Sequence, residues 1–421
     1  MHRFSVIVLS ATALLIAGLA EAPQKSEPLK DNQIMKYENP KDFIVSARVF
    51  LYPDSGLIGR DQFAGWTYTD FTLVMPYVTE SGTSWLTSSS ETSVIAAIAL
   101  NGAPANLDTV PTRTVPGTSA SYATLNVPGT VSFSAAEAMI AVKVTAVETD
   151  FDDEAAWNLP WAEAGSLGGW LQRDAVYDQP LKDGTDPIQM MLDRWTEGND
   201  PKQIPPVQLA KYLTANVLDH MRATGSNRRT PLGRSASSLV WRINDDDGTF
   251  SGATVRTPQN LVGGFVVQNA GNAIQAKEGS EHDLANVLTA VFRCAGLPAR
   301  TVIGVDNLNT GDDEVKSWVE FAIRAPDVDE PIWVPVDVWE LESDGRSTRN
   351  WEQPWKHFGS TDELRNVPPI AYHFHPPANY RSYSLPALFG IQSDTELPDF
   401  GVQAVDFEVN GAPKRGGQPR P

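Results

Sequence analysis

The chain of 421 residues contains a single cysteine, Cys294. One cysteine excludes an internal disulfide framework and any zinc site built from several cysteines. Basic residues are also scarce, because 33 Lys and Arg stand against 52 Asp and Glu and leave a formal net charge of -19. Nucleic acids and anionic membrane surfaces require clustered Lys and Arg, so we expect neither as a partner. The acidic balance fits a protein outside the cytoplasm or one that meets a basic partner.

Beyond the first residues the chain has no long apolar run. Arg3, the apolar run 6–19 and the small-x-small pattern Ala20-Glu21-Ala22 predict a secretory signal over residues 1–22. An uncleaved anchor is the alternative, but the run is shorter than the roughly 20 residues that a spanning helix needs. We therefore predict a secreted or periplasmic protein whose mature chain has no spanning segment.

The N-terminal third carries strand patterns and no helical apolar stripe. Residues 23–42 are polar and predict a linker. Over residues 43–150, short β-branched and aromatic runs alternate with Gly, Pro, Asn, Asp and Ser, which favours an antiparallel β-sandwich. We expect this domain to give support or to contact a partner.

Residues 151–205 predict a Trp-rich connector with one helix. Its aromatic side chains either bury against two neighbouring domains, which we favour, or stack on sugars. Asp186 followed by Pro187 is typical of an N-cap and the first helical residue.

At the other end of the chain, residues 346–400 predict a loop-rich extension and residues 401–421 a disordered tail.

The stretch 279–300 predicts a buried helix that leads directly into a strand. Ser280 is placed to cap the helix and Asp283 to complete a capping box, so the helix begins at about Glu281. Apolar residues then recur at helical spacing, and Gly296 and Pro298 are stop signals.

The same stretch resembles the start of a transglutaminase-like domain, which has a papain-like cysteine-enzyme fold. That family has Gly-x-Cys-x-Asp/Glu-x-Ala and an apolar helix ending in Arg-x-x-Gly-Ile/Leu-Pro-Ala-Arg. The positions that fit in register are Gly279, Asp283, Ala285, Arg293, Gly296, Leu297, Pro298, Ala299 and Arg300. The resemblance covers about residues 206–342. It implies an α+β fold: a transglutaminase-like domain over 206–345, with a central helix on an antiparallel sheet, behind the β-sandwich.

Three positions of the resemblance correspond to the family's catalytic Cys, His and Asp. Glu281 stands at the cysteine position, Lys316 at the histidine position of Lys316-Ser317-Trp318-Val319-Glu320, and Asp337 keeps the acid. A carboxylate attacking an amide would give a mixed anhydride instead of a thioester, and a protonated lysine accepts no proton. We therefore expect no acyl transfer. We predict an ion pair between Glu281 and Lys316, with Asp337 as second acceptor.

The remaining candidate residues are weaker. Trp318 is a candidate binding residue that we expect to pack, and His282 one that we expect at the rim of the site. His373 and His375 would share a face of an extended segment, which is compatible with a metal, but two imidazoles without a third ligand favour packing or surface roles. We expect no cofactor, and Cys294 is expected to be a small buried hydrophobe.

The sequence leaves three functions open. The first is a secreted, catalytically inactive transglutaminase-like protein that acts as a binding or scaffold module for a protein, peptide or cell-wall ligand. The second is a hydrolase or amidase of altered chemistry on peptide or cell-wall substrates. The third is a purely structural envelope protein. A cleft over Glu281 would favour ligand binding, and a closed ion pair the structural role.

Overall fold

A computed structural model describes most of the chain. The described residues are 27–52, 66–87, 94–105, 107, 112–114, 120–133, 135–161, 165–174, 177–223, 230–231, 238–243, 250–255, 267–306, 314–326, 328–344, 350–373, 380–381, 388–393 and 402–410. The predicted signal 1–22 and His375 lie outside these residues.

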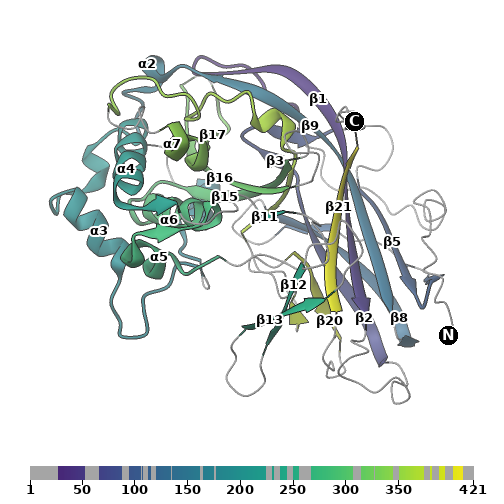
Figure 1. The fold of residues 1–421 in the computed structure, drawn as a ribbon. Coiled ribbons are helices and arrows are strands. Elements are labelled where there is room, and N and C mark those ends of the chain that lie inside the picture. The colour runs from purple at the N-terminus through teal and green to yellow at the C-terminus, as the bar shows by residue number, and fades with distance from the viewer. Residues whose placement is uncertain are drawn as a thin grey trace, which may run out of the picture.

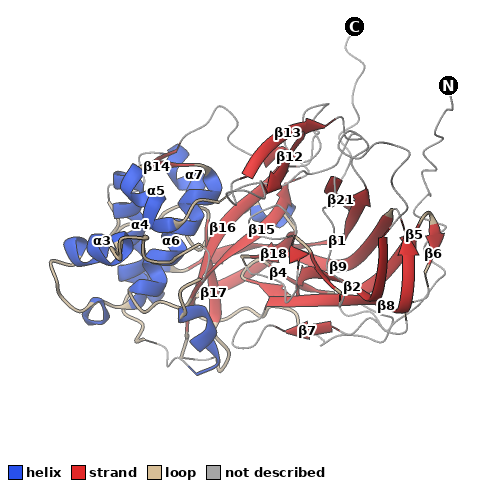
Figure 2. Cartoon of the chain, turned by 90° about the horizontal axis from the view of Figure 1, so that it is seen from below, coloured by secondary structure: helices blue, strands red, loops and turns tan. Residues whose placement is uncertain are grey.

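The fold is mixed α+β, with the helices gathered on one side of the molecule and the long strands on the other (Figures 1 and 2). The α-helices of the described residues are α2 (Asp153–Ala156), α3 (Pro187–Trp195), α4 (Pro206–His220), α5 (Ala270–Ala276), α6 (Glu281–Cys294) and α7 (Val338–Asp344). The cap predicted for α3 is present, because the Asp186 side chain accepts a hydrogen bond from the Gln189 amide and Pro187 opens the helix.

Two antiparallel sheets lie on the strand-rich side. One has the order β21-β1-β9-β4-β3, with β5 and β6 joined through β9, and the other has the order β19-β20-β2-β8-β7. The strands of the first sheet are β1 (Met35–Tyr52), β3 (Glu80–Ser81), β4 (Ser84–Leu86), β5 (Val94–Leu100), β6 (Ala103–Pro104), β9 (Ala136–Phe151) and β21 (Val402–Asn410). Those of the second are β2 (Trp66–Val78), β7 (Thr112–Thr114), β8 (Ala120–Phe133), β19 (Tyr380–Arg381) and β20 (Gly390–Gln392).

Apolar side chains from both sheets share one core, which includes Val45, Leu73, Leu125 and Ile140. The sheets use both ends of the chain. Strand β1 already begins at Met35, inside the predicted linker, and β21 pairs with β1 along its length, from Ile44 opposite Asn410 to Tyr52 opposite Val402. A disordered tail from residue 401 is therefore wrong for 402–410, because these residues gain a partner strand from the distant N-terminal part of the chain.

A third sheet supports the central helix. Its order is β11-β16-β15-β18, with β17 beside β16. The bounds are β11 (Thr230–Pro231), β15 (Ala299–Asp306), β16 (Glu314–Ile323), β17 (Ile332–Val336) and β18 (Pro369–Tyr372). Strand β18 and β20 lie within residues 346–400, so this predicted loop-rich extension contributes strands to two sheets. The remaining short strands are β10 (Arg222–Ala223), paired with β14 (Glu278–Gly279), and β12 (Ser238–Ile243), paired with β13 (Phe250–Val255).

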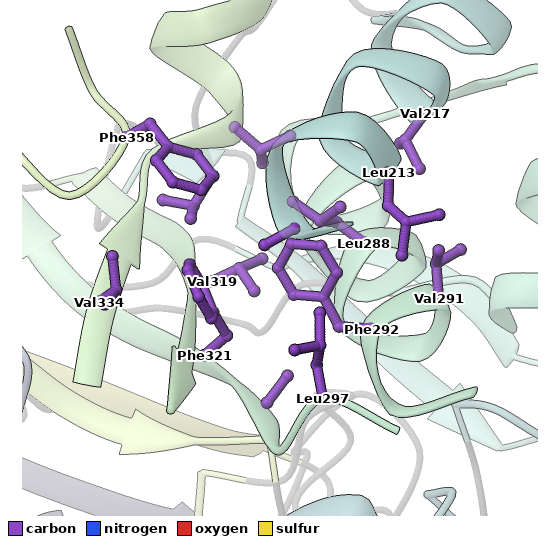
Figure 3. Packing of buried hydrophobic residues seen from close by; sticks show 14 of the residues in the cluster. Leu213, Val217, Leu288, Val291, Phe292, Leu297, Val319, Phe321, Val334 and Phe358 are labelled. Carbon is purple, nitrogen blue, oxygen red and sulfur yellow. The ribbon is translucent and has the colours of Figure 1, made fainter. Parts of the chain in front are cut away.

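Helix α6 is buried between this sheet and helix α4. Figure 3 shows Leu288, Val291 and Phe292 of α6 packed between Leu213 and Val217 of α4 and Val319 and Phe321 of β16. Leu284, Val287, Leu288, Val291 and Phe292 have no exposed surface. The apolar residues predicted at helical spacing are therefore buried, and burial extends around the helix, because every residue from Glu281 to Phe292 is buried.

Residues 342–344, at the end of the predicted transglutaminase-like domain, form the last part of helix α7. The Asp337 side chain accepts a hydrogen bond from the Glu340 amide at 3.3 Å, which satisfies a free amide of the first turn. Val338 and Leu341 are buried below this cap. The helix thus follows strand β17 directly and brings Glu340 towards Asp337.

The tryptophans of the connector differ in their surroundings. Trp170 is buried against Trp333 and Tyr372, with ring centroids 5.8 Å and 5.4 Å apart. Trp157 is half-buried and stacks on Trp351, with centroids 5.8 Å apart. These contacts agree with aromatic side chains that join parts of the molecule.

Candidate functional site at the start of helix α6

The capping box predicted for helix α6 fixes the position of Glu281. The Asp283 amide donates to Ser280 Oγ at 3.2 Å, and the Ser280 amide donates to Asp283 Oδ2 at 2.8 Å. A Cβ atom on Gly279 would lie 2.6 Å from the Asp283 Cβ, so a larger residue before the cap would displace it. Glu281 is then the first helical residue, and only 2% of its surface is exposed.

Glu281 points towards strand β16. Its Oε1 accepts a hydrogen bond from the Ser317 amide at 3.0 Å, next to Lys316. The carboxylate therefore combines two favourable contacts, a strand amide and the positive end of the α6 dipole.

Lys316 is buried in a group of carboxylates. Its Nζ lies 2.6 Å from Asp337 Oδ2 and 3.5 Å from Glu340 Oε1, and 1% of its side chain is exposed. Burial alone would lower the pKa of this ammonium, but Asp337, Glu281 and Glu340 outweigh that effect and raise the pKa above its ordinary 10.5. Lys316 is therefore a protonated lysine at neutral pH.

The three triad-equivalent positions thus lie in one buried, charged group. Which carboxylate contacts Lys316 most closely differs from the prediction. Asp337, expected as the second acceptor, makes the 2.6 Å ion pair with Lys316. Glu281 acts on Lys316 through its charge and through its contact with the neighbouring amide. A direct contact between Glu281 and Lys316 stays a prediction.

His282 lies inside the protein, so its expected rim position is wrong. Only 3% of its surface is exposed, and its Nδ1 lies 2.7 Å from Ser317 Oγ. Burial lowers the pKa of this imidazole to about 4, so it is neutral at pH 7. The rim was expected from the helical rotation of roughly 100 degrees per residue, but the whole first turn of α6 is covered.

The contact between His282 and Ser317 is the feature that sequence reasoning missed. Ser317 is fully buried on β16. A serine hydroxyl within hydrogen-bond reach of a neutral histidine is the arrangement that nucleophilic catalysis requires. No local motif marks this pair, because it depends on how α6 lies across β16.

Trp318 is fully buried as well, and its Nε1 donates to Glu320 Oε1 at 3.0 Å. Glu320 also receives the Gly82 amide at 2.8 Å and forms an ion pair with Arg300, 2.8 Å from Arg300 Nη2 to Oε2. The Arg300 guanidinium lies 3.6 Å from the centroid of the Trp333 ring. Trp318 and Glu320 thus belong to a packed network, away from solvent.

Of the two late histidines, the structure describes His373, which contacts Tyr177 and Thr301. His373 is buried, its ring centroid is 5.0 Å from that of Tyr177, and its amide donates to the Thr301 carbonyl. Within the described residues, Asp337, Glu340 and Glu363 bring carboxylate oxygens within 4.8 Å of one another, as in a cation site. The Lys316 ammonium already lies against two of them.

Cys294 closes helix α6 and is partly buried, and its Sγ lies 3.1 Å from Gln189 Oε1. Burial raises the pKa of the thiol to about 12. This cysteine is therefore protonated at neutral pH and far along the helix from Glu281, which does not suit a displaced nucleophile.

Within the described residues, every helix is too short or too polar to cross a membrane.

No curated protein sequence matches the chain. Among solved structures, a "putative cysteine protease" from Cytophaga hutchinsonii matches with 10% identity and a TM-score of 0.46, covering 89% of this chain and 100% of that one. The periplasmic domain of TgpA from Pseudomonas aeruginosa matches with 14% identity and a TM-score of 0.28, covering 78% and 100%.

The sequence model of the Transglutaminase-like superfamily matches residues 264–338. This range contains helix α6, strands β15, β16 and β17, and the positions of Glu281, Lys316 and Asp337. Residues 264–338 of this chain are therefore a transglutaminase-like region.

Proposed function

We propose that this protein is a secreted or periplasmic, catalytically inactive member of the transglutaminase-like proteins that acts as a binding or scaffold module. The observation that carries the proposal is the ion pair of Lys316 with Asp337 at 2.6 Å. At the position where the family has a base, this chain has a protonated ammonium. At the position of the nucleophilic thiol it has a carboxylate.

The chemistry of these two replacements supports inactivity. Acyl transfer in this fold needs a thiolate, a group that takes up a proton, and an acid that orients that group. Lys316 could act as a base only after losing its proton, and the surrounding carboxylates raise its pKa. Glu281, Lys316 and Asp337 are each at most 2% exposed, so a substrate has no access to them in this conformation.

The strand-rich part of the molecule supports a scaffold role. We propose that the two sheets with a shared core form the antiparallel β-sandwich, completed by C-terminal strands. The predicted signal over residues 1–22 supports export. The large β-surface would then support the transglutaminase-like domain and present it to a partner.

A turnover experiment tests the proposal. We expect the purified mature protein to leave glutaminyl peptides with an amine donor, and peptidoglycan fragments, unchanged. The control is the double variant Glu281→Cys/Lys316→His, which restores the family residues beside Asp337; a rise in thiol reactivity would show that the site geometry supports catalysis. Turnover by the unmodified protein that Glu281→Gln abolishes would overturn the inactive function.

A hydrolase of altered chemistry is the second candidate, and the Ser317 contact with His282 at 2.7 Å is the observation that favours it. Its full burial speaks against it, because Ser317 cannot meet a substrate without an opening of the site. A serine-reactive fluorophosphonate probe separates the two candidates. Labelling that Ser317→Ala removes would establish the hydrolase, and absence of labelling would support the inactive protein.

A purely structural envelope protein is the third candidate, and the burial of all three triad-equivalent positions favours it. It differs from a binding module in having no ligand. A specific ligand site elsewhere on the molecule would therefore decide between these two.

A further inference from the structure

A pocket of about 240 Å³ lies where three segments distant in the sequence meet. The N-terminal segment 27–37 forms one wall, the β3–β4 hairpin another, and the turn 328–331 before β17 the third. Trp333 lines it at the start of β17, whereas Asp337 follows the end of the same strand. The two places are separated by about 13 Å along the strand, so the pocket is distinct from the triad-equivalent group.

The Glu80 side chain is half-buried in this pocket. Burial raises the pKa of its carboxyl, and the charges of Glu320 and Glu330 raise it further, whereas Arg300 lowers it. Within the described part of the chain, the side-chain donors that reach Glu80, Arg300 Nη2 and the Tyr372 hydroxyl, donate to its backbone carbonyl. The carboxylate itself has neither a hydrogen bond nor an ion pair there, which is costly for a half-buried charge.

The nearby positive charges are already engaged. Arg300 is paired with Glu320 behind the pocket, at 2.8 Å. Lys30 on the pocket wall is paired with Glu27, also at 2.8 Å, and both of these side chains are largely exposed. The exposed Asp329 and Glu330 therefore add to the negative charge of Glu80 at the pocket mouth.

Aromatic side chains form part of the same wall. Tyr37 is half-buried in the pocket, and burial and the charge of Glu80 raise the pKa of its phenol, so the hydroxyl is neutral beside the carboxylate. Trp333 is buried, and one of its ring faces is covered by Arg300. Carboxylates beside aromatic rings are the surroundings that ammonium and guanidinium groups prefer.

We propose that this pocket binds the cationic side chain of a basic partner protein, through the carboxylates of Glu80 and Glu330. Its volume is smaller than the roughly 300–1,000 Å³ of pockets that enclose whole small molecules, which suits one inserted Lys or Arg side chain. The ammonium or guanidinium would meet Glu80 in the interior and Glu330 at the exposed mouth. This site explains how an acidic protein selects a basic partner.

The binding test uses short peptides and the mature protein. Titration with N-acetylated, C-amidated Gly-Lys-Gly and Gly-Arg-Gly, followed by NMR or calorimetry, should give saturable binding with a dissociation constant on the order of 1 mM or tighter. The neutral Gly-Gln-Gly peptide should not saturate. Comparison of the Lys and Arg peptides with n-butylamine shows whether a peptide backbone contributes in addition to the cationic group.

Two variants locate the site. Glu80→Gln and Glu330→Gln should each weaken binding of the basic peptides at least about fivefold, whereas Glu352→Gln, an exposed acid outside the pocket, should not. Glu330 is exposed, so its variant remains informative if Glu80→Gln fails to fold. Equal binding of the Gln peptide, no saturable binding, or binding unchanged by Glu330→Gln would overturn the proposal. The outcome does not depend on turnover, so it is separate from the test of catalytic inactivity.

Discussion

Two buried ion pairs lie on strand β16 of the transglutaminase-like domain, and they differ in how their charges are balanced. Arg300 and Glu320 lie directly opposite each other on β15 and β16, 2.8 Å apart. Lys316 and Asp337 lie 2.6 Å apart near the start of helix α6. Each of these four side chains is at most 1% exposed.

The Arg300 pair is balanced and fully surrounded. Glu320 accepts from Arg300, Trp318 and the Gly82 amide, so its two oxygens are satisfied. The rings of Trp333 and Tyr372 lie 3.6 Å and 4.7 Å from the guanidinium carbon. A Cβ atom on Gly82 would lie 2.4 Å from the Trp333 carbonyl oxygen. The β3–β4 hairpin can therefore approach Trp333 this closely only with glycine at position 82. This pair therefore joins the hairpin of one sheet to the core of another.

The Lys316 pair has an excess of negative charge. One ammonium meets Asp337, Glu340 and the charge of Glu281. An enzyme site with a thiolate and an imidazolium also concentrates charge at the start of this helix. The comparison indicates that the Arg300 pair is balanced by its partners within the packed core, whereas the Lys316 group concentrates negative charge near the start of helix α6.

Removal of Arg300 should have the largest effect. Arg300→Met leaves the Glu320 carboxylate buried without its partner and removes the contacts with the aromatic rings, so we expect a loss of about 4 to 5 kcal/mol in the free energy of unfolding. Urea denaturation measures the loss. Arg194→Met, at an exposed arginine of α3, is the matched control and should change stability by less than about 0.5 kcal/mol. Equal stability of the two variants would remove the structural role of the Arg300 pair.

Removal of Lys316 should have the next largest effect. Lys316→Met leaves several carboxylates close together in the interior, so we expect a loss of about 3 kcal/mol at pH 7. The pKa of Lys316 is raised above 10.5 in the folded protein, so its stabilisation is complete below pH 10.5 and is lost as pH rises through the folded pKa. The difference between the unmodified protein and Lys316→Met should therefore shrink only above about pH 10.5.

Lys182→Met, at an exposed lysine, provides the control for the Lys316 experiment. Its stability should follow that of the unmodified protein at each pH. A Lys316→Met protein as stable as this control at pH 7 would show that the charged group contributes no net stability. Of the two buried ion pairs, only that of Arg300 with Glu320 would then be expected to stabilise the fold.

The sequence predicted the features of helix α6 that depend on residues close together in the chain. The capping box of Ser280 and Asp283 is confirmed because both partners lie within one turn of helix. The partner order around Lys316 was not predictable, because it depends on the register of β16 against β17 and on helix α7. The pattern Asp337-x-x-Glu340 resembles a capping box and could have indicated that helix.

Contacts between distant segments could not be predicted either, because they depend on how separate elements pack together. The pairing of β21 with β1 joins residues near both ends of the chain, and neither strand pattern identifies its partner. His282 was expected at the rim because helical rotation describes directions around one helix. It does not describe which neighbouring elements cover them.

The smallest effect is expected at the outer edge of the Lys316 group, where Glu363 Oε2 lies 3.2 Å from His357 Nδ1. The contact with His357 lowers the pKa of Glu363 to about 2, although partial burial acts in the opposite direction. Because this side chain is 40% exposed, solvent screening should limit the loss in Glu363→Gln to less than about 1 kcal/mol at pH 7.

The pH dependence of that small loss distinguishes a specific contact from a general effect of charge. A carboxyl with a lowered pKa stabilises the folded state above its ordinary pKa of 4.5, and this contribution is lost as pH falls towards 2. The difference between the unmodified protein and Glu363→Gln should therefore decrease between these pH values, as measured by urea denaturation. Glu352→Gln, at an exposed acid, should show no such decrease. Identical pH profiles of the two variants would show that the contact of Glu363 with His357 adds no stability of its own.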